Sequence, residues 1–256
     1  MTFYEPLGDN RYRATEHTVG PWDPGSQHGG PPAALLAHAI EVTSPSWPAT
    51  VARMSVEILS PIPVSDMLVR SRVLRPGRSV ELVEAELDAL GRTVMRAQAW
   101  RIRRADLQLP PNDQITEPVP MFPAAELPLR PGWGGGYLHA IEWRHVAGDW
   151  ADAGPATIWG RMRHLLLPDE EPTGLQRVMV VADSGNGVSS VLPLDRWLFI
   201  NTDLTVHLEA VPPGEWICLD ARTRIDRLGF GLATSQVFDR DRLVGHGAQT
   251  LYVATR

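Results

Sequence analysis

Residues 175–187 read LQRVMVVADSGNG, an apolar run that ends at a carboxylate and a Gly-Asn-Gly break. One helical face carries Leu175, Val178, Met179 and Ala182, and the remaining apolar positions are Val180 and Val181. A helix that is apolar on most sides is buried on most sides. We therefore expect the helix at 172–182 to be covered by a sheet.

The same order of elements occurs on both sides of a proline-rich stretch. A helix is expected at 28–44, where Gly29 and Gly30 precede two prolines that suit a first helical turn. Runs of strand length with partial alternation follow it at 51–60, 67–74, 79–87 and 92–102. After the helix at 172–182, the corresponding runs are 202–211, 215–225, 231–238 and 242–253. The chain therefore contains one pattern twice.

The two patterns also share residues near their ends. At a constant offset of 151, Asp88, Ala97 and Gln98 match Asp239, Ala248 and Gln249. Between the patterns, residues 105–131 contain seven prolines and little periodicity, which is typical of a surface connection. We predict an internal duplication with units at 1–104 and 132–256, joined by 105–131.

A helix followed by antiparallel strands predicts an α+β fold in which each sheet wraps around its helix. Two such units can pair their sheets edge to edge, which covers edges that would otherwise be exposed. We expect one continuous sheet with both helices packed against its concave side.

Composition excludes several classes of protein. The 256 residues are 43% hydrophobic and 21% charged, and the net charge of −6 comes without a long basic run, so we expect no nucleic-acid partner. The single cysteine, Cys218, excludes an intrachain disulfide framework and is expected to be a small buried residue. No apolar run reaches membrane-spanning length and the first residues do not read as a signal peptide, so we expect a cytoplasmic protein.

Asp183 stands where the apolar run ends. A carboxylate near a helix C-terminus opposes the helix dipole, so it is a poor choice for merely ending a helix. On helical spacing it lies about 80° from Leu175, at the flank of the apolar stripe. Such a carboxylate can face a cleft while its helix stays buried, which favours a functional role.

Four stretches together resemble the double-hotdog acyl-CoA thioesterases. They are HGGPPAALLAHA (28–39), VVADSGNG (180–187), FINTDLTVHLEAVPPGEWICLDART (199–223) and VGHGAQTLYV (244–253). The resemblance covers nearly the whole chain. It implies a double hotdog fold, hydrolysis of an acyl-CoA thioester in fatty acid metabolism, and no metal or cofactor.

The resemblance also implies a site in which three side chains hold a water molecule. The carboxylate of that site falls on Asp183 and its glutamine on Gln249. The middle member falls on Asn201, or on Thr202 if the register slips by one residue. An asparagine there departs from the hydroxyl residue that is usual in the family, because an amide can bind water but cannot act as a hydroxyl does.

These residue types suit thioester hydrolysis. A carboxylate can accept the proton of the attacking water, and neutral amides can position that water. The backbone N–H groups of Gly29 and Gly30 could receive the thioester oxygen at a helix N-terminus. His28 could be a base, a structural residue or a residue at the substrate's edge, and Asp203 could assist Asp183 or pair with an arginine.

Two other functions stay open at this point. The asparagine at 201 is compatible with a non-catalytic acyl-binding protein. A hydratase or dehydratase needs a histidine paired with a carboxylate, and neither His28 nor His38 has an evident partner in the sequence. Because no carboxylate stands near His38, we expect Gln98 to be structural and one of two duplicated sites to be lost. A homodimer is compatible with the sequence.

Overall fold

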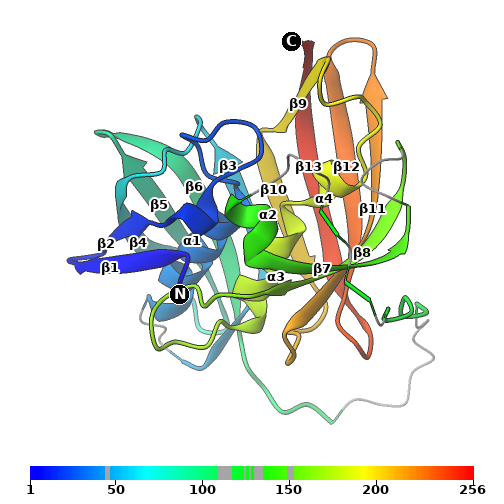
Figure 1. The fold of residues 1–256 in the computed structure, drawn as a ribbon. Coiled ribbons are helices and arrows are strands. Elements are labelled where there is room, and N and C mark those ends of the chain that lie inside the picture. The colour runs from blue at the N-terminus through cyan, green and yellow to red at the C-terminus, as the bar shows by residue number, and fades with distance from the viewer. Residues whose placement is uncertain (44–46, 109–116, 124, 127, 130–134, 149–152) are drawn as a thin grey trace.

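A computed structural model of the chain describes residues 1–43, 47–108, 117–123, 125–126, 128–129, 135–148 and 153–256. Within these residues, thirteen antiparallel strands form one sheet. The sheet curves around two central helices, with the N-terminal half of the chain on one side and the C-terminal half on the other (Figure 1).

The first half contains β1 (Tyr4–Gly8), β2 (Arg11–Ala14), η1 (Glu16–Thr18), α1 (Gly30–Val42), β3 (Ala49–Ile58), β4 (Asp66–Arg75), β5 (Val80–Ala89) and β6 (Arg92–Arg103). The second half contains α2 (Gly136–Ala140), β7 (Ile141–Ala147), β8 (Ala156–Met162), α3 (Gly174–Ala182), α4 (Gly185–Val188), β9 (Trp197–Asn201), β10 (Asp203–Leu208), β11 (Trp216–Asp226), β12 (Phe230–Phe238) and β13 (Leu243–Thr255).

The order of strands across the sheet is symmetric. It runs β1-β2-β4-β5-β6-β3 and then β10-β13-β12-β11-β8-β7, while β9 pairs with β13. The halves meet where β3 and β10 pair antiparallel, from Arg53 opposite His207 to Glu57 opposite Asp203. This arrangement confirms the expected α+β double hotdog, with one continuous sheet.

The two helices are buried because they lie between the sheet halves and against each other. Every residue of α3 except Arg177 is buried, as the all-round apolar pattern predicts. A capping box begins this helix, in which the Thr173 hydroxyl accepts from the backbone N–H of Gln176. Helix α1 begins with two buried prolines in its first turn, where missing N–H groups cost no helical hydrogen bond.

The strands of the sheet were predicted in part. All eight expected runs are strands, but the sequence analysis missed β1, β2, β7, β8 and β9. Strands β1 and β2 are short and mostly exposed, so they lack the alternation that marks a half-buried strand. The described residues of the connection contain no helix or strand, and Phe122 packs there against Trp159 and Trp216.

The residue match at offset 151 does not correspond to the structural match. Ala97 pairs with Val56 of β3 while Gly247 pairs with Val206 of β10, so equivalent positions are 150 residues apart and Gln249 corresponds to Ala99. Because side chains alternate along a strand, a one-residue shift sends them to opposite faces. The interpretation of Gln98 as the counterpart of Gln249 is therefore wrong.

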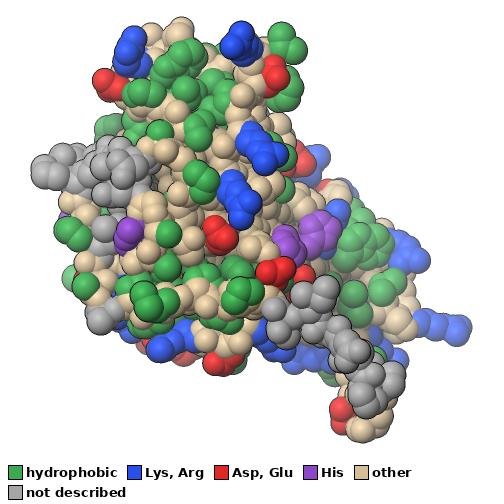
Figure 2. Space-filling model, turned by 90° about the vertical axis from the view of Figure 1, so that its right-hand side faces the viewer, with side chains coloured by type: hydrophobic (Ala, Val, Ile, Leu, Met, Phe, Trp, Pro, Cys, Tyr) green, Lys and Arg blue, Asp and Glu red, His purple; other side chains and the backbone are tan. Residues whose placement is uncertain are grey.

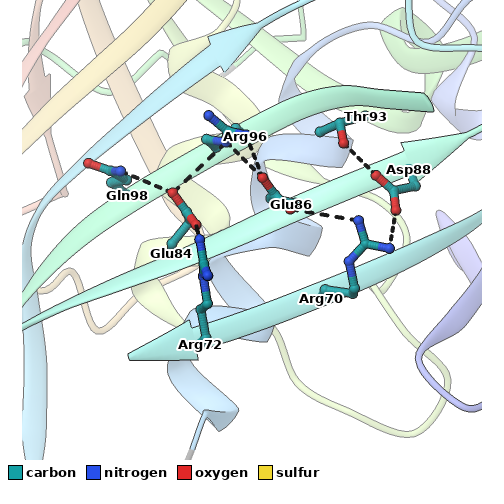
Figure 3. Close-up of polar contacts among 8 residues, drawn as sticks. All are labelled: Arg70, Arg72, Glu84, Glu86, Asp88, Thr93, Arg96 and Gln98. Atoms are coloured by element: carbon teal, nitrogen blue, oxygen red, sulfur yellow. Dashed lines mark hydrogen bonds and ion pairs between the residues drawn. The ribbon is translucent and has the colours of Figure 1, made fainter. Parts of the chain in front are cut away.

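Gln98 lies instead on the outer face of the first half. Its amide donates to Glu84 at 3.1 Å, within a group of charged side chains on β4, β5 and β6 (Figure 3). The charged side chains on this face pair with one another, since each arginine in the group has a carboxylate partner. Gln98 is thus structural, as expected, but for a different reason.

Candidate active site

Asp183 caps the C-terminal end of α3 and is only 4% exposed. Its Oδ1 accepts a hydrogen bond from Asn201 Nδ2 at 2.8 Å and a longer one from Gln249 Nε2 at 3.3 Å. A hydrogen bond that a charged group accepts is stronger than a neutral one, so these amides hold the carboxylate firmly. The structure thus brings together three residues that are distant in the sequence.

Gln249 is held from both ends of its amide. It is 2% exposed on the inner face of β13, and its Nε2 also donates to the backbone carbonyl of Asp183 at 3.0 Å. Its Oε1 accepts from the backbone N–H of Asn186, at the start of α4, at 3.0 Å. These bonds fix which end of the amide faces the carboxylate. The role of Asn186 has no sequence signal because it uses a backbone group.

Thr202 and Asp203 are placed away from Asp183. The Thr202 side chain is exposed and contacts the carbonyl of Thr250 at 3.4 Å. Asp203 Oδ1 accepts from the backbone N–H of Thr250 at 2.7 Å, and the described residues give it no arginine partner. Between the two alternatives for the middle position, Asn201 is therefore the residue that contacts the carboxylate.

The two glycines before α1 allow the helix ends to approach closely. A Cβ atom on Gly29 would lie 2.8 Å from Asp183 Oδ2, and one on Gly30 would lie 2.3 Å from the carbonyl oxygen of Val180. Both distances are too short for real contacts. The GG pair is thus required to bring the N-terminus of α1 against the C-terminus of α3, where the carboxylate lies.

His28 adds a contact that the sequence analysis missed. Its Nδ1 lies 3.1 Å from Asp183 Oδ2 and also 3.1 Å from the backbone N–H of Gly30. One ring nitrogen can either donate to the carboxylate or accept from the amide, so the tautomer selects one bond. Burial lowers the pKa of His28, and the nearby Asp183 carboxylate opposes that shift.

The ring of Tyr137 packs against the ring of His28. The two rings stack with centroids 3.7 Å apart and planes 9° from parallel. The Tyr137 hydroxyl lies 2.8 Å from both the carbonyl of Val180 and the hydroxyl of Ser184, and burial raises its pKa. Tyr137 therefore ties the imidazole to the end of α3. No pattern in the sequence around α2 indicated this role.

A cavity of about 330 Å³ borders these residues. Its lining includes His28, Ser184 and Asn186 at the Asp183 end, and the apolar side chains of Trp22 and Leu194. A larger hollow of about 530 Å³ lies elsewhere, lined by His207, His246 and Ala248 among others. Figure 2 looks onto that side of the molecule and shows arginine, acidic and histidine side chains there.

The larger hollow is separated from the site by the sheet. Its residues His246 and Ala248 alternate along β13 with Gln249, which faces inward. Of the two, the smaller cavity is the one bordered by His28, which contacts Asp183, and by Ser184, which follows Asp183 in the chain.

A carboxylate also lies near the C-terminal end of α1, beyond His38 and Ala39. Glu41 accepts hydrogen bonds from the Thr173 hydroxyl at 2.9 Å and from Gln176 Nε2 at 2.8 Å, at the start of α3. Burial raises the pKa of Glu41. With Ala99 in the place of Gln249, no amide from β6 reaches this carboxylate. The expectation of no carboxylate around His38 and Ala39 therefore does not extend to the last turn of α1, where Glu41 lies.

The described residues contain no group of three side chains that could hold a metal ion. They also contain no helix long and apolar enough to cross a membrane. Cys218 is fully buried, and burial raises the pKa of its thiol, which confirms that it is a packing residue.

Comparisons with known proteins bear on the family and the fold of this chain. Residues 18–102 match the family described as acyl-CoA thioesterase N-terminal domain, and residues 117–253 match the acyl-CoA thioesterase C-terminal domain. No curated protein matches the sequence.

Solved structures share the fold over almost the whole chain. An acyl-CoA thioesterase II, TesB2, from Mycobacterium marinum is 17% identical, with 99% of this chain and 95% of that chain covered and a TM-score of 0.68. The tesB protein of Mycobacterium avium subs paratuberculosis is 16% identical, with 98% and 95% covered and a TM-score of 0.73. A hot dog fold protein of unknown function from Alicyclobacillus acidocaldarius is 16% identical, with 98% and 96% covered and a TM-score of 0.75. At these identities the structures support the fold, and the two family matches together show that the chain belongs to the acyl-CoA thioesterase family.

Proposed function

We propose that this protein hydrolyses an acyl-CoA thioester to a free acid and CoA, with Asp183 as the general base. The observation that carries the proposal is that the two oxygens of the Asp183 carboxylate have different partners. Oδ1 already accepts from two amides, Asn201 and Gln249, while Oδ2 faces Gly29 and His28. Oδ2 is therefore the oxygen that can accept a proton from water.

The start of α1 supplies the second requirement, a donor for the thioester oxygen. Pro31 and Pro32 have no N–H, so Gly29 and Gly30 carry the available donors of the first turn. In the described residues the N–H of Gly29 has no protein partner, whereas that of Gly30 contacts His28 Nδ1. We assign binding of the oxyanion to the backbone N–H of Gly29. When His28 Nδ1 is protonated and bonded to Asp183, it no longer accepts from Gly30, and the N–H of Gly30 can bind the oxyanion as well.

In the reaction, water attacks the thioester carbonyl carbon and gives its proton to Asp183 Oδ2. The negative charge that develops on the carbonyl oxygen is stabilised at the N-terminus of α1. Collapse of the tetrahedral intermediate breaks the C–S bond, and the proton on Asp183 can pass to the departing thiolate. Asn201 and Gln249 orient the carboxylate throughout.

The contact between His28 and Asp183 supports one alternative, a hydratase or dehydratase, because it supplies the histidine–carboxylate pair that such chemistry needs. A panel of saturated acyl-CoA and 2-enoyl-CoA thioesters, assayed with a thiol reagent, separates the functions. We expect thiol release. Addition of water to the enoyl bond without thiol release would establish a hydratase, and saturable binding without either reaction would establish an acyl-binding protein.

We further propose that the units extend over 1–104 and 132–256 with a connection at 105–131, and that the protein acts without a cofactor. Activity that survives dialysis against a chelator would support cofactor independence with respect to metals. A cytoplasmic location, a part in fatty acid metabolism and a homodimer are likewise proposals.

A further inference from the structure

Two arginines lie close together near the site cavity, and one of them is part of its lining. Arg256 lines the cavity, and its guanidinium carbon lies 5.5 Å from the ring centroid of Trp22. The backbone N–H of Arg256 donates to the carbonyl of Arg196 at 3.1 Å, so both residues stand at the same end of the sheet. Figure 1 shows this end of the sheet, where the C-terminus lies above β13.

These arginines differ from those on the outer face of the first half. There, Arg70 pairs with Asp88, Arg72 with Glu84 and Arg96 with Glu86 (Figure 3). Neither Arg196 nor Arg256 has a carboxylate within 4.0 Å among the described residues. Two exposed arginines without acidic side-chain partners therefore stand at this end of the sheet, and one of them lines the cavity, in a chain whose net charge is −6.

The cavity lining contains both Arg256 and His28, which contacts Asp183. Its inner end is formed by His28 and Ser184, and its walls include Leu138 and Leu194. A ligand that fits has a narrow, largely apolar or amide-containing arm, with the reacting group at one end and negative charge at the other. Asp195 also lines the outer end and would repel such a charge.

We propose that Arg256 and Arg196 bind the phosphate groups of the carrier that bears the acyl thioester, with the carrier's pantetheine arm in the cavity. This inference rests on the proposed hydrolysis. Guanidinium groups suit phosphate because they donate several hydrogen bonds in a planar fork. CoA and the arm of an acyl carrier protein share the phosphate next to pantetheine, so either source meets the requirement.

The test measures kcat/KM with three thioesters of the same acyl group: acyl-CoA, acyl-phosphopantetheine and acyl-pantetheine, which has no phosphate. Arg256→Gln should lower kcat/KM for acyl-CoA about tenfold, the loss expected for one hydrogen bond to a charged group, and leave acyl-pantetheine within about twofold. Asp195→Asn should act in the opposite direction on the same substrates. Arg103→Gln, an exposed change at the far end of β6, is the matched control and should leave all three substrates unchanged.

The substrates also identify the carrier. A tenfold loss on acyl-phosphopantetheine supports recognition of the shared phosphate, and a loss confined to acyl-CoA supports recognition of phosphates that only CoA carries. An equal loss on acyl-pantetheine, or no loss on acyl-CoA, would overturn the proposal. The wild-type protein hydrolyses at least one thioester in each of these outcomes, whereas failure to hydrolyse any of them would reject the proposed function itself.

Discussion

Replacing Asp183 by asparagine isolates proton acceptance from every other property of the site. The new carbonyl oxygen can occupy the place of Oδ1 and accept from Asn201 and Gln249, at the present 2.8 and 3.3 Å. The new amide nitrogen then occupies the place of Oδ2, 3.1 Å from His28 Nδ1, and can donate to it. The variant therefore keeps the size and the hydrogen bonds of the site, and it loses only the group that takes a proton from water.

The magnitude follows from this geometry. A general base contributes about 10²–10⁴-fold, so kcat of Asp183→Asn should fall by at least about 100-fold. KM should change by less than about threefold, because the helix start and the cavity are untouched. The two bonds at Oδ1 lose their charge assistance, so the free energy of unfolding should change by less than about 2 kcal/mol.

The assay is thiol release from the best acyl-CoA of the panel, together with urea unfolding of each variant. Asp203→Asn is the matched control, since Asp203 bonds to the backbone of Thr250 rather than to Asp183 and should keep nearly full turnover. If Asp183→Asn retained more than a tenth of the wild-type kcat while folded, Asp183 would not be the base. A larger loss in Asp203→Asn than in Asp183→Asn would move that role to Asp203.

Three further predictions test the surroundings of the carboxylate. Gln249→Ala should lower kcat, and it should lower the free energy of unfolding by about 1–3 kcal/mol because two buried backbone groups lose their partner. Gln98→Ala, on the outer face, is the control and should leave turnover within about twofold. Equal losses of turnover in the two variants would contradict the assignment of faces. Gly30→Ala should destabilise the protein by about 1–3 kcal/mol in urea unfolding, since its Cβ meets the Val180 carbonyl at 2.3 Å, and an unchanged midpoint would show that the helix ends can separate freely. Because the pKa of His28 is lowered on folding, His28 in the unfolded chain takes up a proton before His28 in the folded chain as pH falls below about 6.5, so stability should decrease there. His28→Asn should flatten this part of the profile of melting temperature against pH. An identical profile in the variant would assign the effect to other groups.

Local patterns in the sequence were sufficient for the central helices and for eight of the thirteen strands. The apolar residues of α3 recur on every side of the helix, and the strand runs alternate, because burial on one or both faces constrains each position separately. Strands β1 and β2 were missed because they are mostly exposed and no such constraint acts on them, and β7, β8 and β9 were missed as well.

The contacts of the candidate site depended on the tertiary structure. Resemblance to a family pointed to Asp183, Gln249 and either Asn201 or Thr202, and only the folded chain shows which of the last two reaches the carboxylate. The repeat in sequence suggested Gln98 as a counterpart, yet pairing between strands shifts the match by one residue and thus to the other face.

The contact between His28 and Asp183, and the carboxylate Glu41 at the other helix end, were also beyond the sequence. Both depend on how closely the ends of α1 and α3 approach, and 155 positions along the chain separate His28 from Asp183. The spacing of apolar residues along one helix or strand indicates which of its residues are buried, because each residue's burial depends on the face of the element on which it lies. Which polar group meets which depends on the register of strands and the spacing of helices, and those are decided by the packing of the whole sheet around both helices.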